Sequence, residues 1–512
     1  MTARIGFLLR MALGLAALVA IAMAVAALQA ARSGIDIAAI DIDGTPATVH
    51  RPSDSTAPLP SIVIAHGFAG SQQLMQSFAL AFAANGYNAV TFDFAGHGRN
   101  AAPLTGDITD ETGATRTLMA ETASVAAFAR GLGDGRLAVL GHSMASDIVI
   151  RLAQQETDID ATIAVSMFSP VVTATTPPNL LVIVGEWEGM LKTEALRAVG
   201  LATAPDLAAP EITYGDPAAG TGRRATFSPN VEHASVLFSR HSLREAVGWA
   251  DETFGIDRAA PLAVPSRGPW IALLLGGSVV LAFALAPLLP IVSAKRLGAG
   301  LGWRRLWLPL LVPMLATPLI LRVLPTDFLP VLVGDYLAAH FAVYGLITMA
   351  CLWLRERQGL PGWRPASLAA LGVATLAVVG FGFLALVWPI DLYVTSFVPG
   401  AQRVPLLFAM FAGTLLFFLS DEWLTRGEGA ARGAALASKL AFVVSLAIAV
   451  ALDFERLFFL VIIVPVIVLF LIVYGLISAF AYRRTGHPFV GGIASAVAFA
   501  WAIGVTFPML AG

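Results

Sequence analysis

The chain has 512 residues, of which 57% are hydrophobic and only 13% are charged. An ordinary soluble domain is about a quarter charged, so this composition excludes a simple cytosolic globular protein and a disordered chain. The single cysteine, Cys351, excludes a disulfide scaffold, and the net charge of −2 gives no reason to expect a nucleic-acid partner. The apolar residues are unevenly distributed, which predicts a soluble domain flanked by membrane segments.

An apolar segment opens the chain. Arg4 and Arg10 come first, and residues 11–28 are then apolar, which is long for a signal-peptide core and adequate for a spanning helix. The small-residue pattern at 24–26 is also compatible with cleavage. Residues 1–32 are therefore interpreted as a signal anchor or a cleaved signal, and in both cases the following domain is exported.

Residues 33–260 alternate short β-rich runs with helical stretches. The clearest continuous apolar runs are 61–65, 89–92, 137–140 and 180–184. Short buried strands separated by helices predict a doubly wound, mostly parallel sheet that is covered on both faces. The length of this segment fits a single α/β domain.

A linker at 261–269 leads into a polytopic transmembrane domain at 270–512. Its apolar runs predict an all-α bundle of about eight transmembrane helices. The runs are 270–292, 306–324, 328–354, 367–389, 404–420, 438–453, 457–481 and 489–510. Asp335 and His340 lie within one of these runs, and either a functional role or interfacial and packing polarity explains them.

The basic residues predict how these helices are oriented. With the N-terminus inside and the helices alternating, most flanking arginines and lysines fall in cytoplasmic segments, as the positive-inside rule requires. These residues are Arg4, Arg10, Lys295, Arg296, Arg304, Arg305, Arg355, Arg357, Arg364, Arg426, Arg432, Lys439, Arg483 and Arg484. The outer flanks hold only Arg32, Arg267, Arg322, Arg403 and Arg456. We therefore expect a multi-pass protein of the plasma or inner membrane with the α/β domain outside the cytoplasm.

Three separate sequence segments suggest a catalytic site: the turn that contains Ser143, an earlier His-Gly turn, and later loops with acidic residues and histidines. The turn that contains Ser143 carries the clearest motif. The sequence Gly-His-Ser-Met-Ala at 141–145 follows a buried strand and opens a predicted helix at 145–155. This strand-to-helix context is typical of a nucleophile elbow, in which a sharp turn exposes the serine hydroxyl. Ala145 stands where a second glycine is usual, and a turn without chemical significance is the alternative.

The second piece is a His-Gly turn at 66–67, directly after the strand at 61–65. Such a turn presents a backbone N–H to a developing oxyanion, together with the N–H of the residue after the nucleophile. Phe68 and Met144 are the expected donors. The side chain of His66 is interpreted as structural.

The order of these pieces resembles the α/β-hydrolase superfamily. The His-Gly loop, the sequence Phe-Asp-Phe-Ala-Gly-His-Gly at 92–98 and the turn at 141–145 carry the resemblance, which covers roughly residues 40–256. It implies structural roles for Asp93 and His97. It also implies a triad acid just past the strand that ends at Val184 and a triad histidine after the last strand.

Glu188 occupies the implied acid position, with Glu186 as its competitor. We expect the last strand at 211–214, and His233 in the following loop is the implied base. His241, at the start of the closing helix, is the alternative. The resemblance thus implies a triad of Ser143, His233 and Glu188.

The predicted function is hydrolysis of a carboxylic ester or a related acyl bond by a membrane-bound serine hydrolase. Esterase or lipase, peptidase and thioesterase chemistry all use the same residues. No cofactor and no metal is implied, and the expected partners are the lipid bilayer and a small acyl substrate, lipid-like ones included. Two alternatives remain: a transporter or sensor membrane domain with an attached ligand-processing domain, and an acyltransferase. The sequence carries no indication of protein partners.

Overall fold

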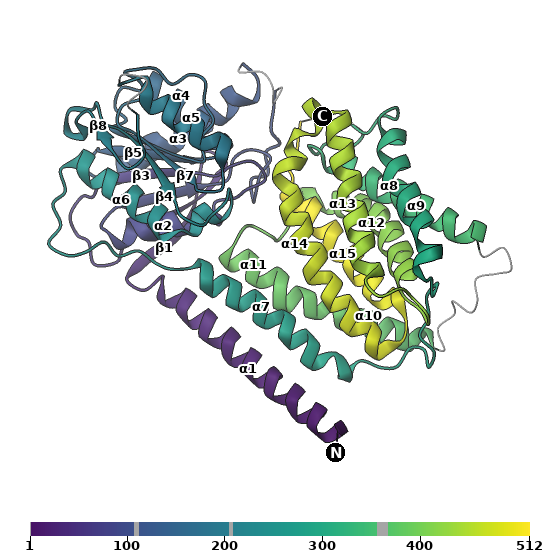
Figure 1. Ribbon diagram of the computed structural model, residues 1–512. Helices are drawn as coiled ribbons and strands as arrows, with labels where there is room; N and C mark the ends of the chain where they lie inside the picture. The colour runs from purple at the N-terminus through teal and green to yellow at the C-terminus, as the bar shows by residue number, and fades with distance from the viewer. Residues whose placement is uncertain (1, 107–111, 204–207, 356–366, 512) are drawn as a thin grey trace. The chain divides into compact units, whose positions relative to one another are not determined.

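The computed structural model describes residues 2–106, 112–203, 208–355 and 367–511 (Figure 1). It divides into two compact units, which we call the sheet unit and the helical unit. The sheet unit comprises Met23–Leu273, Ile390–Ser396 and Pro508–Gly512. The helical unit comprises Met1–Ala22, Leu274–Pro389 and Phe397–Phe507.

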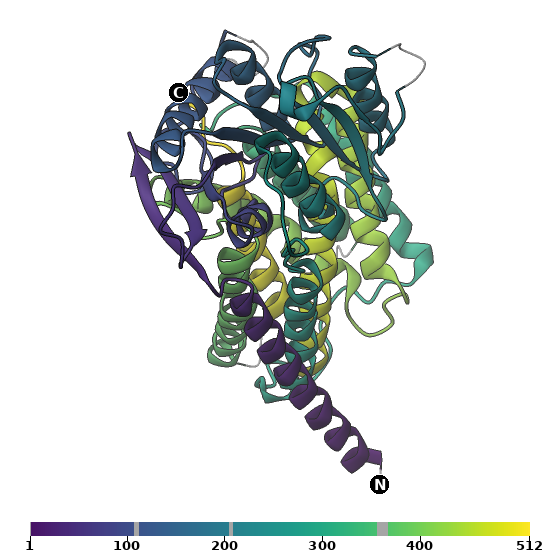
Figure 2. The same ribbon diagram turned by 90° about the vertical axis from the view of Figure 1, so that its left-hand side faces the viewer.

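Nine strands of the described residues form one sheet in the order β1-β2-β4-β3-β5-β6-β7-β9-β8. Their bounds are β1 Ile35–Ile42, β2 Thr45–Pro52, β3 Ser61–Ala65, β4 Asn88–Phe92, β5 Leu137–His142, β6 Ala161–Val165, β7 Leu180–Gly185, β8 Thr213–Tyr214 and β9 Arg223–Ser228. The sheet is parallel from β4 to β9 and antiparallel at both edges. Figure 2 shows the β1–β2 pair at one edge. The four strands expected from apolar runs are confirmed.

The expectation that the last strand lies at 211–214 is wrong. Residues Thr213–Tyr214 form only the short antiparallel edge strand β8, and the last strand is β9. It begins Arg223-Arg224 and so lacks the apolar run by which the other central strands were recognised. Arg223 is nevertheless buried, because β9 pairs with β7 on one side and β8 on the other.

Helices cover both faces of the sheet, and alternate residues of each strand face opposite ways. On one face lie α2 (Gln76–Ala84) and α6 (Arg240–Phe254), packed on a core that includes Ile62 and Ile64 of β3. On the other face lie α3 (Ala114–Leu132), α4 (Met144–Gln155) and α5 (Gly189–Gly200). This layering leaves the carboxyl ends of the parallel strands, and the loops that follow them, as the common edge for a site.

The helical unit is built from long apolar helices. In the described residues, nine helices are long and apolar enough to cross a membrane, and that they do cross one stays a prediction. They are α1 Thr2–Ala30, α7 Gly268–Leu285, α8 Trp303–Leu321, α9 Gly334–Arg355, α10 Leu368–Gly382 continuing through α11 Trp388–Tyr393, α12 Val404–Thr425, α13 Ala434–Leu452, α14 Phe454–Thr485 and α15 Pro488–Thr506. Among the basic residues used for orientation, Arg357, Arg364 and the side chains of Arg4 and Arg355 lie outside the described part.

Polar side chains inside the helical unit meet partners on neighbouring segments. Asp335 accepts hydrogen bonds from the backbone N–H groups of Phe328 and Tyr336, at 3.0 and 2.8 Å. His340 is fully buried and its Nε2 lies 3.1 Å from Ser445 Oγ on α13. Asp335 thus satisfies backbone donors where α9 begins, which favours a packing role for it over a chemical one.

Candidate functional site

Ser143 occupies a sharp turn between β5 and α4. Its backbone has φ 53° and ψ −119°, a region that costs free energy for a residue with a side chain. The turn depends on Gly141, since a Cβ there would lie 2.2 Å from the carbonyl oxygen of Ala145. The strand therefore delivers Ser143 to the carboxyl edge of the sheet and leaves its side chain half-buried.

A continuous hydrogen-bond chain runs from Ser143 to Glu188. The Oγ of Ser143 lies 2.9 Å from Nε2 of His233, and Nδ1 of His233 lies 2.6 Å from Oε1 of Glu188. A carboxylate only accepts, so Nδ1 carries the proton and Nε2 is free to accept the serine hydroxyl proton. This is the geometry that a serine nucleophile and its base require.

Two further donors fix the carboxylate of Glu188. The Ser166 hydroxyl and the backbone N–H of Gly185 both donate to Oε2, at 2.8 and 2.6 Å. Only 6% of the Glu188 side chain is exposed, so these hydrogen bonds and the imidazole replace the water that the carboxylate loses. Ser166 follows β6 directly and has φ 51°, and the sequence analysis did not single it out.

The two alternatives from the sequence lie elsewhere. Glu186 accepts the backbone N–H of Asn230 at 2.8 Å and so holds the loop that carries His233. His241 lies on α6, with Nε2 2.7 Å from Thr226 Oγ1. The structure thus brings Glu188 and His233 to Ser143, and it gives Glu186 and His241 other neighbours.

The His-Gly turn after β3 runs against the turn at Ser143. A Cβ on Gly67 would lie 3.0 Å from the Ser143 Cβ, so a side chain at this position would crowd the turn at Ser143. Phe68 follows at once, and Met144 is the first residue of α4, where backbone N–H groups lack helical partners. The two backbone donors expected from the sequence thus belong to segments that meet at Ser143.

His66 has a structural position within this turn. It is fully buried, its Nδ1–H donates to the Gly67 carbonyl at 2.8 Å, and its Nε2 accepts the Phe94 N–H at 3.1 Å. Burial lowers the pKa of His66, which keeps the ring neutral as this pattern of one donor and one acceptor requires. Asp93 accepts both backbone and side-chain N–H groups of Gln72, tying the same two loops together.

His142 is a neighbour of the site that sequence reasoning missed. Its Nε2–H donates to the backbone carbonyl of His233 at 3.0 Å, and the two imidazole rings lie 4.9 Å apart. Burial lowers the pKa of His142 to about 3, so the ring stays neutral and adds no charge beside His233. The sequence feature that could have pointed to His142 is its position directly before Ser143 in the turn.

Two distant segments of the chain belong to the sheet unit and reach the loops around the site. Ser396 donates its backbone N–H to Ser71 Oγ at 2.8 Å, just after the His-Gly turn. Met509 donates its N–H to the carbonyl of Gly96 at 2.9 Å and accepts the Leu104 N–H at 2.8 Å. The Ala511 N–H donates to the carbonyl of Leu104 at 2.9 Å. These contacts support the loops that follow β3 and β4.

Large apolar side chains are exposed on the loops after β6 and β7 and at the start of α5. Phe168, Trp187 and Met190 are 62%, 66% and 72% exposed. Because β6 and β7 are parallel neighbours, their following loops lie at the same edge of the sheet as Ser143. The surroundings of the site are therefore partly apolar.

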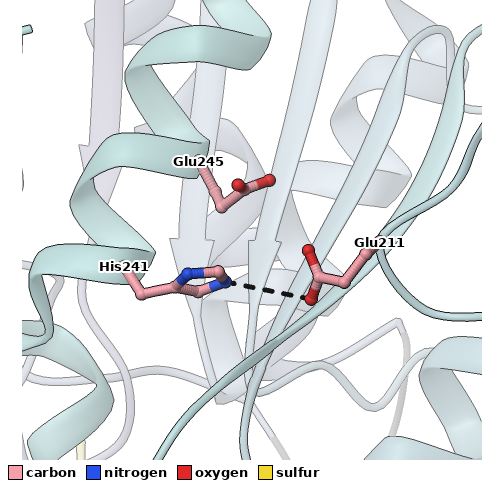
Figure 3. Close-up of side chains that lie close together, drawn as sticks. All are labelled: Glu211, His241 and Glu245. Carbon is pink, nitrogen blue, oxygen red and sulfur yellow. Dashed lines mark ion pairs between the residues drawn. The ribbon is translucent and has the colours of Figure 1, made fainter.

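Glu211, His241 and Glu245 also lie close together, away from Ser143 (Figure 3). Their potential ligand atoms lie within 4.8 Å of one another. Arg224, however, pairs with both carboxylates, at 3.1 Å to Glu211 and 2.9 Å to Glu245. The guanidinium already supplies the positive charge that a metal ion would bring, so we interpret the group as an ion-pair network between β9 and α6.

Comparison with known proteins finds one matching family and several similar solved structures. Residues 56–202 match the family described as serine aminopeptidase, S33. An epoxide hydrolase from Vigna radiata is 22% identical over 27% of this chain and 42% of its own length, with a TM-score of 0.22. A protein described as a predicted CIB-like hydrolase from Thermoplasma acidophilum is 17% identical over 42% of this chain and 97% of its own, with a TM-score of 0.34.

No curated protein matches the chain. The chain spans less than half the length of the epoxide hydrolase. The family match covers the region from the start of β3 to the end of α5, which includes Ser143 and Glu188. Together with the mostly parallel sheet and its helices on both faces, this match supports an α/β-hydrolase fold for the sheet unit.

Proposed function

We propose that this protein is a membrane-bound serine hydrolase that cleaves a carboxylic ester or a related acyl bond. The observation that carries the proposal is the hydrogen-bond chain from Ser143 through His233 to Glu188, at 2.9 and 2.6 Å. Its order along the sequence is serine, acid, histidine, which is the order of α/β-hydrolase triads.

In this mechanism Ser143 attacks the carbonyl carbon of the substrate while His233 Nε2 takes the hydroxyl proton. Glu188 holds Nδ1–H and stabilises the imidazolium that forms. The N–H groups of Phe68 and Met144 bind the oxyanion of the tetrahedral intermediate. His233 then returns the proton to the leaving group, and water hydrolyses the acyl-enzyme by the same steps.

The side chains around the site favour one type of acyl group. The exposed side chains of Phe168, Trp187 and Met190 favour an apolar acyl chain over a charged one. The description of the matching family adds peptide bonds at a free N-terminus to the substrates that need testing. The nine long apolar helices in the described part of the chain support a location in a bilayer, where lipid-like acyl esters are available as substrates.

A fluorophosphonate probe tests the proposal directly. We expect the full-length protein in detergent to be labelled at Ser143 and to hydrolyse p-nitrophenyl esters, with longer acyl chains turned over faster than acetate. Ser143→Ala should abolish labelling and reduce turnover by about a thousandfold or more. Ser53→Ala is the matched control and should keep both labelling and turnover, since Ser53 is an exposed serine just after β2. Retention of a tenth of the wild-type activity in Ser143→Ala would eliminate Ser143 as the nucleophile.

A further inference from the structure

The helical unit contains a cavity of about 220 Å³ with a basic lining. It lies where α7 and α14 end, beside the third turn of α1. Arg10 comes from α1, Phe283 and Pro287 from α7 and the turn after it, and Phe480, Arg483 and Arg484 from the last turns of α14. Segments that are far apart in the sequence thus contribute the arginines.

Several contacts hold this lining in place. The Arg10 guanidinium lies over the Phe283 ring, 4.5 Å from its centroid, and Phe283 meets Phe480 edge to face at 5.2 Å. Arg484 Nε donates to the Leu289 carbonyl at 2.8 Å. A Cβ on Gly14 would lie 3.2 Å from Ala284, which shows how closely α1 approaches α7 one turn further on. These contacts hold the guanidinium groups of Arg10 and Arg484 at the cavity, although the Arg10 side chain is half-buried and that of Arg484 is exposed.

The positive charge of the cavity lacks a counter-charge. Of the described residues that line it, none is acidic, and Arg10, Arg483 and Arg484 form no ion pair within the described part of the chain. The partial negative charge at the C-terminal end of α14 attracts Arg483 and Arg484. It does not explain Arg10, which a different helix contributes. Guanidinium groups that line one cavity repel one another, and an anion bound between them would offset this repulsion.

We propose that this cavity binds the phosphate-bearing headgroup of an anionic phospholipid. Arginine donates paired N–H groups to phosphate oxygens, and the planar guanidinium suits that geometry better than a lysine ammonium. The ends of membrane-spanning helices lie at the level of lipid headgroups, and basic pockets between such helices are typical headgroup sites. The apolar faces of α1 and α14 beside the cavity then accommodate the acyl chains.

Lipid binding to the full-length protein in a nonionic detergent tests this proposal. Fluorescent cardiolipin and phosphatidylglycerol should bind more tightly than phosphatidylcholine with the same acyl chains. Arg10→Gln, Arg483→Gln and Arg484→Gln should each weaken binding of the anionic lipids about fivefold, and the triple variant about a hundredfold. Arg10→Lys keeps the charge and should lose less than Arg10→Gln. Arg304→Gln is the matched control, because Arg304 is an exposed arginine at the start of α8 that does not line the cavity.

Three outcomes would overturn the assignment. Equal binding of phosphatidylcholine removes the need for an anionic headgroup. If the triple variant elutes like the wild type on size exclusion and still binds the lipid equally well, the lipid site lies outside this cavity. Complete displacement of the lipid by inorganic phosphate at equal concentration assigns the cavity to a soluble phosphate instead. If the triple variant aggregates, the single variants decide, since each removes one exposed or half-buried side chain.

Discussion

At the level of single residues, Glu186 and Glu188 follow β7 two positions apart and have different neighbours. Glu188 contacts the imidazole of His233, whereas Glu186 accepts a backbone N–H. We expect Glu188→Gln to lower kcat for a p-nitrophenyl ester by about a thousandfold or more, because an amide neither stabilises the imidazolium nor enforces its tautomer. Glu186→Gln should change kcat less than about threefold, since the amide oxygen still accepts the Asn230 N–H. The reverse ranking would move the acid to Glu186.

The buried histidine on β2, His50, leads to a prediction about how stability depends on pH. Burial lowers the pKa of His50 to about 4, against 6.5 in an unfolded chain, and the ring is 2% exposed. Below pH 6.5 the unfolded chain therefore takes up a proton that the folded chain refuses. The stability that depends on the neutral ring is complete above pH 6.5 and is lost as the pH falls towards 4.

Chemical unfolding at pH 7.5 and pH 4.5 measures this effect. The wild type should lose more unfolding free energy between these pH values than His50→Leu, by roughly 2 kcal/mol. Val49→Ala removes a buried side chain of β2 that does not titrate, and it should lower the unfolding free energy by the same amount at both pH values. A pH dependence that is the same in His50→Leu and wild type contradicts the prediction.

At the level of elements, the sequence predicted those parts whose signal is local. The strand before Ser143 and the helix after it were recognisable because a buried strand and a helix begin and end within a few residues of the turn. The last strand, β9, was missed because Arg223 and Arg224 break the apolar pattern, although its pairing with β7 buries the first of them. The donor Ser166 was not predictable from the sequence, because its contact with Glu188 bridges two loops that only the sheet brings together.

The segment after α15 is expected to contribute to the stability of the sheet unit. Met509 and Ala511 make three backbone hydrogen bonds with Gly96 and Leu104, and each is worth about 1 kcal/mol. Ending the chain after Phe507 should therefore lower the Tm of the sheet unit by roughly 5–10 °C, and ester turnover should fall as the loop after β4 loosens. Met509→Ala keeps the backbone hydrogen bonds and should unfold close to the wild-type Tm. An unchanged Tm in the shortened chain would show that the pairing contributes nothing.

At the level of the whole molecule, the proposed orientation rests on the distribution of basic residues. With Cys351 replaced by Ala, we expect Ala219→Cys to react with a membrane-impermeant maleimide in intact cells, because Ala219 is exposed between β8 and β9. Glu428→Cys, in the loop between α12 and α13, should react only after permeabilisation. We choose Glu428 over Gly429, whose φ of +85° strains any side chain.

The two cysteine positions distinguish two ways in which the predicted membrane topology could be wrong. Labelling of Ala219→Cys only in permeabilised cells would place the hydrolase domain in the cytoplasm and remove substrates of the outer leaflet. Labelling of Glu428→Cys in intact cells, with Ala219→Cys as expected, would instead mean that one of the helices between them does not cross the membrane.

The discontinuous make-up of the sheet unit has a consequence for biosynthesis. Residues 23–273 leave the ribosome early, whereas Ile390–Ser396 and Pro508–Gly512 are translated only after most or all of the membrane helices. The loops around Ser143 thus acquire their last hydrogen-bond partners when translation of the bundle is complete. A nascent chain that lacks the later segments also lacks these hydrogen bonds, so we expect the sheet unit to reach its full stability only after both units have been translated.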